Sequence, residues 1–257
     1  MLSALAGVLG FPVGHSRSPA MMNAAFGELG IDWRYLRLPV APERFDETVR
    51  ALPDSGYLGA NVTIPHKVAA HDLSDDLTEA AAAIGAVNTL AFAGGRILGE
   101  NTDAGGLVDA LDMDLQGARA LVLGAGGTGR AAVWALREAG ADVAVWNRTP
   151  ERAAELAEEF GVRHARAPEP ARVLVNVTSL GMHREDLPEQ VGLAGVSPEV
   201  VADVVYGGRP TPLCRWAEQQ GARIVDGLEM LLRQGARSFE RWTGQPAPLD
   251  VMRAALR

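Results

Sequence analysis

The sequence predicts an α/β protein of two domains, the second built on a doubly wound parallel sheet. Three observations lead to this prediction. Short apolar runs alternate with helix-like segments along the chain, and the middle of the chain repeats a strand–helix–strand pattern. The third observation is size, because 257 residues with 47% hydrophobic and 22% charged residues can fill two modest hydrophobic cores.

The first hundred residues are expected to form the N-terminal α/β domain. The predicted strands are Val8–Phe11, Trp33–Val40 and Gly59–Ile64, the predicted helices are Ser18–Leu29 and Asp72–Ile84, and a predicted hairpin joins Asn88–Phe92 to Arg96–Leu98 through Gly94 and Gly95. In the first helix, we expect the Ser18 hydroxyl to cap the N-terminus and Pro19 to occupy the first helical position.

The middle of the chain is expected to form the doubly wound domain. Its predicted strands are Ala118–Leu123, Asp142–Trp146, Arg172–Val177, Val200–Val205 and Arg223–Val225, and its predicted helices are Thr128–Ala139 and Pro150–Phe160. A later helix, Leu228–Trp242, carries an apolar stripe at helical spacing. We expect the C-terminal helix or helices to return to the first domain. The predicted boundaries are residues 1–102 plus 231–257 for the first domain and residues 103–230 for the second.

Charge and cysteine content exclude several classes of protein. Acidic residues outnumber basic ones by 32 to 24, and the net charge of −8 argues against broad binding to nucleic acid or anionic membranes. The single cysteine, Cys214, excludes an intrachain disulfide and a cysteine-based metal centre. With no targeting segment and no apolar run of about 20 residues, we expect a cytoplasmic protein without a metal site. A homodimer is compatible with the sequence, which does not determine the oligomeric state.

A glycine-rich segment, Gly124–Gly129, reads G-A-G-G-T-G and matches the pattern G-x-G-x-x-G between a predicted strand and a predicted helix. In this pattern, the glycines allow a tight turn, close approach of a pyrophosphate and tight packing of the helix on the strand. The helix N-terminus adds free N–H groups and a partial positive charge. The motif predicts a Rossmann-like, dinucleotide-binding domain.

The end of the next strand predicts which dinucleotide is bound. Domains selective for NAD often carry Asp or Glu about 20 residues after the glycines, where the carboxylate binds the ribose 2′-hydroxyl. Here the strand ends in Asn147, Arg148 and Thr149, and Arg152 follows. Hydrogen bonds to charged groups contribute about 1.5–3 kcal/mol, so an arginine that binds a 2′-phosphate favours NADP. The alternative is that Arg148 is an ordinary surface arginine at the start of a helix.

Lys67 is the only lysine among 24 basic residues. It lies in one of four polar segments that precede the glycine-rich segment. These are Ser16–Pro19, Asn61–Lys67, Ala86–Thr89 and Asn101–Asp103. Their hydroxyls, amides, ammonium and carboxylate suit a small acid that carries several hydroxyl groups. A lysine can exchange a proton during carbonyl reduction, whereas arginine holds its proton too strongly, and Asp103 would orient Lys67. The alternatives are a solvated Lys67 and an Asp103 that only caps a helix.

Taken together, the motifs resemble those of the shikimate dehydrogenase family from about Gly10 to Gly244. The matching segments are S-R-S-P at Ser16–Pro19, N-V-T-I-P-H-K at Asn61–Lys67, G-A-V-N-T at Gly85–Thr89, G-E-N-T-D at Gly99–Asp103, G-A-G-G-T-G at Gly124–Gly129, N-R-T at Asn147–Thr149, N-V-T at Asn176–Thr178, D-V-V-Y at Asp203–Tyr206, and G-L-E-M-L at Gly227–Leu231 with Gln234. The resemblance implies an oxidoreductase of aromatic amino acid biosynthesis that reversibly reduces 3-dehydroshikimate to shikimate with NADPH, in the cleft between a substrate domain and an NADP-binding domain.

The resemblance also implies roles for individual residues. The substrate residues it implies are Ser16, Ser18 and Tyr206 for the carboxylate, Thr63, Asn88, Asp103 and Gln234 for the hydroxyls, and the pair Lys67 and Asp103 for catalysis. The cofactor residues are Gly124, Gly126, Gly127, Thr128, Gly129, Asn147, Arg148, Thr149, Arg152, Thr178, Val204 and Gly227. A packing role for Tyr206 and a solvated Gln234 are the alternatives. Asn61 and Asn101 are expected to fix loops rather than to bind ligand.

One position departs from the family pattern, in which a histidine usually precedes the asparagine of the first helix. This chain has Met22 before Asn23. A thioether cannot carry a proton, so we expect Met22 to have a packing role. Two alternatives to the implied enzyme are a relative that also oxidises quinate or uses NAD, and a non-catalytic NADP-binding sensor. Retention of both Lys67 and Asp103 argues against the sensor.

Overall fold

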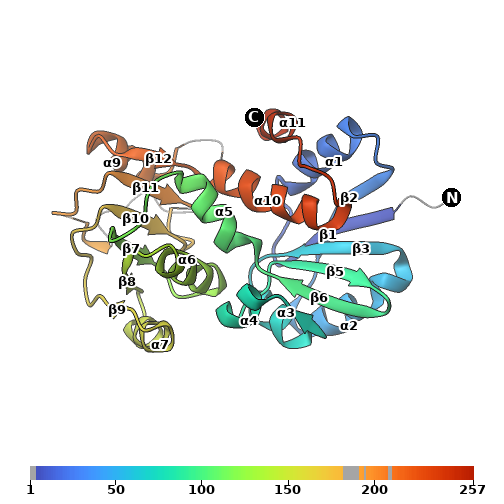
Figure 1. Cartoon of the computed structure of the whole chain (residues 1–257), viewed down its shortest axis with the longest axis horizontal. Helices are drawn as coiled ribbons and strands as arrows, with labels where there is room; N and C mark the ends of the chain where they lie inside the picture. The colour runs from blue at the N-terminus through green and yellow to red at the C-terminus, as the bar shows by residue number, and fades with distance from the viewer. Residues whose placement is uncertain (1–3, 182–190, 194, 208–209) are drawn as a thin grey trace. The chain divides into compact units, whose positions relative to one another are not determined.

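The computed structural model describes residues 4–181, 191–193, 195–207 and 210–257, and the chain divides into two compact units (Figure 1). Unit 1 comprises the residues up to Gly106 together with Leu232–Arg257, and unit 2 comprises Leu107–Leu231. The division falls within two helices, α5 (Thr102–Leu111) and α10 (Gly227–Thr243). Each unit has its own six-stranded sheet, which confirms the predicted α/β class.

Unit 1 contains a mixed sheet with the strand order β2-β1-β3-β5-β6-β4. Its strands are β1 (Ala4–Gly10), β2 (Trp33–Pro39), β3 (Tyr57–Val62), β4 (Asp76–Leu77), β5 (Thr89–Ala93) and β6 (Arg96–Glu100). Strands β1, β2 and β3 are parallel, whereas β5 is antiparallel to both β3 and β6. The carboxyl ends of β1, β3 and β6 therefore meet the start of β5 at one edge of the sheet.

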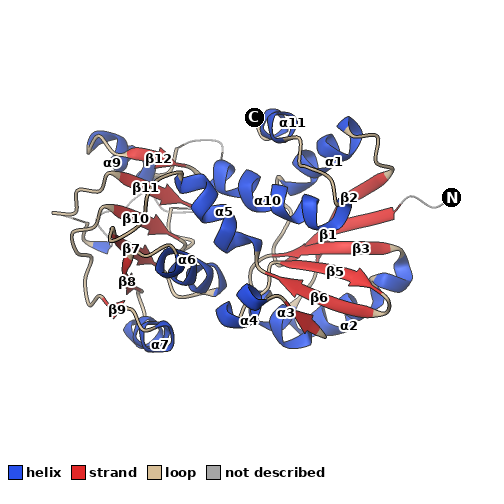
Figure 2. Ribbon diagram, viewed as in Figure 1, coloured by secondary structure: helices blue, strands red, loops and turns tan. Residues whose placement is uncertain are grey.

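Helices cover both faces of this sheet (Figure 2). Besides α5 and α10, they are α1 (Ser18–Glu28), α2 (Phe45–Ala51), α3 (Lys67–Leu73), α4 (Glu79–Ile84) and α11 (Leu249–Ala255), with short 3-10 turns at Pro42–Arg44 and Pro53–Ser55. On one face, Phe45 and Val49 of α2 and Leu73 of α3 share a buried core with the strands. On the other face, Phe26 of α1 contacts Phe239 of α10, with 5.4 Å between ring centroids.

The predicted helix Asp72–Ile84 is wrong, because the chain leaves the helix after Leu73 and forms α4 only from Glu79. Between the two helices, the Asp75 N–H donates to the Ile97 carbonyl, and the Asp75 carboxylate accepts from the Ile97 N–H, both at 2.8 Å. This pairing brings β4 beside β6. Such a contact depends on a distant strand, so local apolar periodicity does not reveal it.

Predictions at two local turns have opposite outcomes. The capping role expected of Ser18 is wrong, because Ser18 is already the first residue of α1. Its N–H donates instead to the Ser16 hydroxyl, at 3.3 Å. The hairpin prediction is confirmed, since β5 and β6 pair around Gly94 and Gly95, whose φ angles are +59° and +75°. Glycine adopts such positive φ values without the strain that other residues incur.

Unit 2 contains a fully parallel sheet with the order β12-β11-β10-β7-β8-β9. Its strands are β7 (Arg119–Leu123), β8 (Asp142–Trp146), β9 (Arg163–His164), β10 (Val173–Asn176), β11 (Val200–Asp203) and β12 (Arg223–Val225), and its helices include α6 (Gly127–Glu138), α7 (Pro150–Phe160) and α9 (Pro212–Gln219). Numbered within the unit, this is the order 3-2-1-4-5-6, which confirms the doubly wound prediction. The sequence reasoning did not identify β9, which has only two residues, or α9.

Candidate functional site

Most of the predicted substrate residues lie at the edge of the unit 1 sheet where four strand ends meet. Ser16 and Ser18 follow β1, and Lys67 follows β3. Asn88 directly precedes β5, and Asp103 lies just after β6 in the first turn of α5. Because β5 runs antiparallel to β3 and β6, its start lies beside their ends. Residues from distant parts of the sequence are brought together there.

Lys67 and Asp103 form a buried ion pair at this edge. Lys67 Nζ lies 2.5 Å from Asp103 Oδ2, and the two side chains are 11% and 7% exposed. The structure thus excludes a solvated Lys67. It also excludes Asp103 as the helix cap, because Asn101 Oδ1 accepts from the Ala104 N–H at 3.2 Å. A buried ion pair adds little to stability compared with apolar residues, so its presence points to a role in the site.

Asn88 connects this ion pair to two other polar groups. Asn88 Nδ2 donates to Asp103 Oδ1 at 2.8 Å, and Asn88 Oδ1 accepts from the Thr102 N–H at 2.7 Å. Because donor and acceptor sides both have partners, the orientation of the amide is fixed. Asn88 Nδ2 also lies 3.3 Å from Gln234 Oε1 on α10. Gln234 is 9% exposed, so the alternative of a solvated Gln234 is wrong.

A second layer of polar side chains lies behind Asn88. The hydroxyl oxygens of Thr89, Thr102 and Ser238 lie 2.8–3.2 Å from one another. Asn61 Nδ2 donates to Ser238 Oγ at 2.8 Å, and Asn61 Oδ1 accepts from the Tyr35 hydroxyl at 2.7 Å. These hydrogen bonds hold the Asn61 side chain in place, but Asn61 lies within β3 and not in a loop as predicted. No individual role was predicted for Thr89, Thr102 or Ser238, although Thr89 and Thr102 lie inside the quoted motifs.

Three further predicted substrate residues have hydroxyls near the ends of β1 and β3. Ser16 and Ser18 are each 5% exposed, and their oxygens lie 3.2 Å apart. Arg37 holds this turn by donating from Nη2 to the Ser16 carbonyl at 2.6 Å. Thr63 is half-buried, and among the described residues its hydroxyl has no hydrogen-bond partner. These hydroxyls are suited to donate to a carboxylate or to hydroxyls of a ligand.

Met22 occupies the position where the family pattern has histidine. Its side chain is fully buried in α1. A Cβ atom placed on Gly235 of α10 would lie 3.5 Å from the Met22 methyl carbon and 2.3 Å from that of Met21. The expected packing role of Met22 is confirmed, because the thioether fills space between these two helices.

His66, the residue before Lys67, is buried and has two defined contacts. Its ring stacks on Phe45 with 4.4 Å between centroids, and its Nε2 lies 2.7 Å from the Val40 carbonyl, so this nitrogen must be the protonated one. Burial lowers the pKa of His66 below 6.5, and the hydrogen bond to Val40 opposes that shift only in part.

We expect the His66→Phe variant to show a weaker loss of stability at acidic pH than the wild type. Below pH 6.5, the His66 ring binds a proton more readily in the unfolded chain than in the folded one. The free energy of unfolding of the wild type therefore falls by up to about 1.4 kcal/mol per pH unit. Above pH 6.5 this effect is absent, and the variant is the less stable protein because it lacks the hydrogen bond to Val40. Urea unfolding at pH 7.5 and at pH 5.5 measures the free energy of unfolding of the wild type and of the variant. Equal losses in the two proteins would contradict the prediction.

Gln234 is placed by close contact between α5 and α10. A Cβ atom on Gly106 would lie 2.7 Å from the Gln234 backbone nitrogen and 2.9 Å from its Cα. A Cβ atom on Gly105 would similarly lie 2.6 Å from the guanidinium carbon of Arg237. The two glycines therefore allow the backbones to approach closely enough for Gln234 to reach Asn88.

We expect Gly106→Ala to lower the free energy of unfolding by about 1–3 kcal/mol, because the added methyl group overlaps backbone atoms. The matched control is Gly27→Ala, at an exposed position of α1 where a Cβ atom would meet nothing within 4 Å. That variant should gain about 0.5–1 kcal/mol, since alanine favours a helix over glycine. Urea unfolding of both variants measures the contrast, and equal effects would refute the close contact.

The glycine loop of unit 2 has the geometry expected of a phosphate-binding turn. Gly124 has a φ of +121°, and a Cβ atom on Gly129 would lie 2.4 Å from the Gly124 carbonyl oxygen. Among the described residues, nothing lies within 4 Å of a Cβ atom placed on Gly126, which leaves space for a ligand to approach the backbone. Gly127 and Thr128 lie in the first turn of α6, and the N-terminus of a helix favours an anionic ligand.

The residues predicted to select the dinucleotide follow β8. Asn147 Nδ2 donates to the Thr149 carbonyl at 3.0 Å, which shapes the turn before α7. Arg148 and Arg152 are exposed, and within the described ranges neither guanidinium has a hydrogen-bond or ion-pair partner. Each is thus available for an anionic ligand.

The remaining predicted ligand residues lie just after the carboxyl ends of β10, β11 and β12. Thr178 donates from Oγ1 to Asn176 Oδ1 at 2.7 Å. Val204 and half-buried Tyr206 directly follow β11, and Gly227 begins α10. Ligands of doubly wound sheets bind outside the carboxyl ends of the strands. Tyr206 is the one predicted substrate residue that belongs to unit 2.

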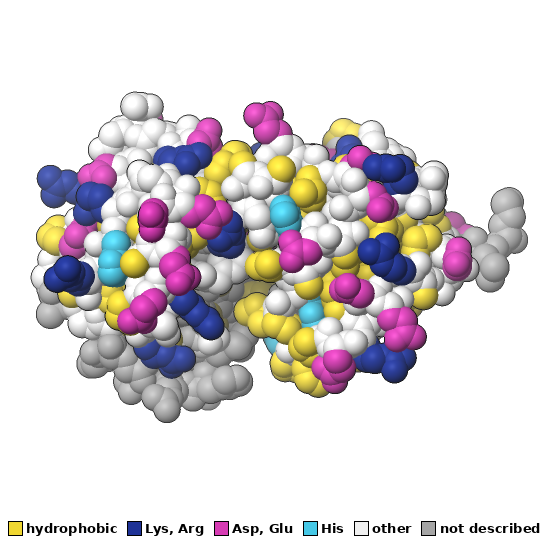
Figure 3. Space-filling view, turned by 90° about the horizontal axis from the view of Figure 1, so that it is seen from below, with side chains coloured by type: hydrophobic (Ala, Val, Ile, Leu, Met, Phe, Trp, Pro, Cys, Tyr) yellow, Lys and Arg dark blue, Asp and Glu magenta, His cyan; other side chains and the backbone are white. Residues whose placement is uncertain are grey.

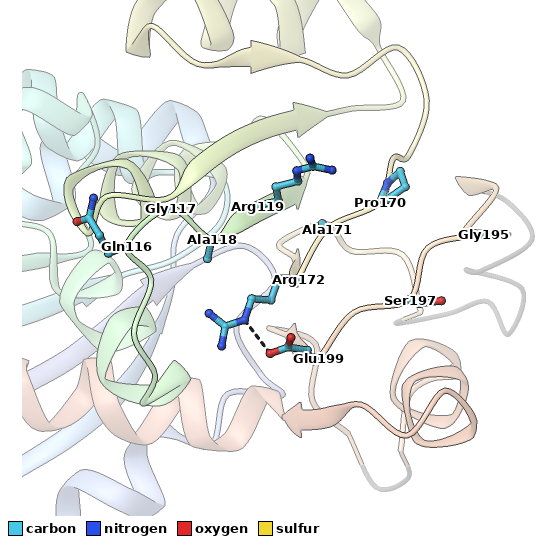
Figure 4. A pocket seen from close by; sticks show the side chains of 10 residues that line it. All are labelled: Gln116, Gly117, Ala118, Arg119, Pro170, Ala171, Arg172, Gly195, Ser197 and Glu199. Carbon is cyan, nitrogen blue, oxygen red and sulfur yellow. Dashed lines mark hydrogen bonds and ion pairs between the residues drawn. The ribbon is translucent and has the colours of Figure 1, made fainter.

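A separate hollow of about 430 Å³ lies at the other edge of the unit 2 sheet, beside the amino ends of β7, β10 and β11 (Figure 4). Arg172 and Glu199 both line it, and Arg172 donates from Nε to Glu199 Oε2 at 2.7 Å. None of the predicted ligand residues lines this hollow. It is therefore not the candidate site.

Metal binding and membrane insertion can be judged from the residues that the structure describes. They contain no group of three His, Cys, Asp or Glu side chains that could hold a metal ion. No helix among them combines the length and the apolar character needed to cross a bilayer. On the face drawn in Figure 3, their acidic and basic side chains are interspersed rather than gathered by sign, unlike the basic patch of a nucleic-acid-binding surface.

Three family models match the chain. The model described as "Shikimate dehydrogenase substrate binding domain" matches residues 8–90. The model "Shikimate / quinate 5-dehydrogenase" matches residues 107–175, and "Shikimate 5'-dehydrogenase C-terminal domain" matches residues 227–257.

Whole-length relatives agree with these models. Shikimate dehydrogenase (NADP(+)) of Methanothermobacter thermautotrophicus is 43% identical, over 98% of this chain and 95% of its own. The crystal structure of shikimate 5-dehydrogenase from Thermus thermophilus in complex with NADP(H) and shikimate has a TM-score of 0.90 at 41% identity, over 99% of this chain and 98% of that chain. The structure of shikimate dehydrogenase from Aquifex aeolicus has a TM-score of 0.93 at 37% identity, over 100% of both chains.

Proposed function

The chain belongs to the shikimate dehydrogenase family, and we propose that it catalyses the reversible, NADPH-dependent reduction of 3-dehydroshikimate to shikimate. The observation that carries this proposal is the buried Lys67–Asp103 ion pair beside Asn88 and Gln234. A protein that only bound NADP would gain nothing from an ammonium group held in this way. The reaction is a step of aromatic amino acid biosynthesis.

The polar groups of unit 1 match the substrate group by group. The hydroxyls of Ser16 and Ser18 donate to the carboxylate, with Tyr206 of unit 2 as a third donor. The ring hydroxyls are bound by Thr63, Asn88, Asp103 and Gln234. A site built to hydrogen-bond several hydroxyls discriminates strongly against analogues that lack them, because its own buried groups would then lose their partners.

Lys67 is the proton donor in the direction of reduction. Its ammonium group gives a proton to the carbonyl oxygen at the position being reduced, as negative charge develops there, and it takes the proton back during oxidation. Asp103 holds Nζ in place through the 2.5 Å contact and balances its charge. Asn88 orients the other oxygen of Asp103. When bound, NADPH supplies the hydride.

The residues of unit 2 fit NADP. The open space beside Gly126 and the N-terminus of α6 suit the pyrophosphate. Arg148 and Arg152 suit the 2′-phosphate, with Asn147 and Thr149 shaping the turn. Residues 103–230 accordingly form the proposed NADP-binding domain, and residues 1–102 with 231–257 the proposed substrate domain. The single cysteine supports a cytoplasmic location.

The direct test is the absorbance of reduced nicotinamide after mixing the protein with shikimate and NADP. Formation of NADPH supports the proposal. Comparison of kcat/KM for shikimate and quinate, with NADP and with NAD, separates it from the alternative of a broader enzyme. Binding of NADP without turnover of any of these substrates would identify a non-catalytic sensor and refute the proposal.

A further inference from the structure

A buried carboxylate in unit 2 takes no part in the chemistry proposed above. Asp203 ends β11, and its side chain is fully buried. It accepts hydrogen bonds from Asn176 Nδ2 at 2.8 Å, from the Val205 N–H at 3.1 Å and from the Thr211 hydroxyl at 2.5 Å. Across the part of the chain that the structure describes, no basic side chain forms an ion pair with it. Burial raises the pKa of Asp203, and the three hydrogen bonds oppose this shift.

The three donors belong to three different segments. Asn176 ends β10, and its Oδ1 accepts from both the N–H and the hydroxyl of Thr178, at 3.2 and 2.7 Å. Val205 belongs to the turn after β11. Thr211 is the N-cap of α9, because its hydroxyl also accepts from the Cys214 N–H. One side chain therefore connects the loop after β10, the loop after β11 and the start of α9.

Both of these loops leave the sheet at the edge where ligands bind. Strands β10 and β11 are neighbours, with Asn176 opposite Asp203 in the parallel register. The turn after β11 also lies close to the start of α10, because a Cβ atom on Gly227 would be 2.6 Å from the Val204 carbonyl oxygen. Three proposed cofactor positions, Thr178, Val204 and Gly227, thus depend directly or through one neighbour on the placement of Asp203.

A carboxylate is a costly choice for a purely structural role at this position. Burial of a charged group without a cation is unfavourable, and a neutral side chain of similar size would avoid that cost. A carboxylate, however, can accept all three hydrogen bonds at once, whereas an amide has only one acceptor oxygen. The carboxylate of Asp203 is thus suited to hold three donors in fixed positions.

We propose that Asp203 is a positioning residue, which holds the loops 176–180 and 203–206 in their ligand-binding geometry before ligands arrive. The inference rests on the proposed function, because it assumes that these loops contact NADP and, through Tyr206, the substrate. Preorganised loops bind more tightly, since less conformational entropy is lost on binding.

The test is Asp203→Asn in the full-length protein, with NADPH affinity measured by fluorescence titration and turnover by absorbance. We expect the Kd and the KM for NADPH to rise about tenfold, because one charge-assisted hydrogen bond is lost from the set. The KM for shikimate should also rise, while kcat at saturation stays close to the wild-type value, since Lys67 and Asp103 are unchanged. A residue that served only stability would leave all these constants unchanged at temperatures where the protein is folded.

Two controls separate positioning from stability. Val173→Ala removes buried volume from the opposite end of β10 and should lower stability without changing the NADPH Kd. Thr211→Ser keeps the hydroxyl and should behave as the wild type, whereas Thr211→Val should weaken NADPH binding. If Asp203→Asn does not fold, the Thr211 pair decides the question. Wild-type affinity in folded Asp203→Asn would overturn the inference, whereas lack of turnover by the wild type would refute the proposed function itself.

Discussion

Replacement of Lys67 by alanine is expected to lower kcat by about 10²–10⁴-fold, the range that a positioned proton donor contributes. The loss should appear in kcat rather than in the Kd for NADPH, because Lys67 belongs to unit 1 and the glycine loop to unit 2. The measurement is steady-state turnover with saturating shikimate and NADP, together with an NADPH titration. A kcat near the wild-type value would eliminate Lys67 as the proton donor.

The main control addresses the charge that Lys67→Ala leaves behind. Asp103 would remain buried without its cation, and loss of one partner of a buried ion pair can cost about 3–5 kcal/mol of stability. The double variant Lys67→Met with Asp103→Asn removes both charges and should recover stability without recovering kcat. Recovery of activity together with stability would show that the pair serves the fold.

Replacement of Arg148 by alanine should raise the KM for NADPH about 10–100-fold and leave the KM for NADH nearly unchanged. The reason is that the guanidinium has a charge-assisted partner only in the cofactor that carries a 2′-phosphate. Steady-state kinetics with each cofactor measures the change in preference. The matched control is Arg50→Ala, since Arg50 is an exposed arginine of α2 in unit 1 and should alter neither value. Equal effects on the two cofactors would contradict the role of Arg148.

The features that could be predicted from the sequence are those encoded within a few neighbouring residues. The glycine loop lies between strand and helix in one short segment, and Gly94 and Gly95 specify their hairpin locally. The presence of a single lysine among 24 Lys and Arg residues singles out Lys67 from the sequence alone. Runs such as Leu121–Leu123 predicted buried parallel strands because such strands are apolar on both sides.

The features that could not be predicted depend on residues far apart in the sequence. The break between α3 and α4 is set by Ile97 of β6, and Ser238 meets Thr89 across 149 positions of sequence. The pattern of neighbouring residues in the sequence contains no information about such distant partners. Similarly, the sequence reasoning placed Asp203 in a motif but could not show that its carboxylate connects three segments. The roles of individual site residues remain predictions that the variants above test.

Because Lys67 is the only lysine of the chain, growth on ¹⁵N-labelled lysine would introduce a single labelled side-chain nitrogen into the whole molecule. Its magnetic resonance signal would need no assignment and no background subtraction. Recorded across a titration, that signal would follow the ionisation of the proposed donor directly, in the free protein and with each ligand added in turn.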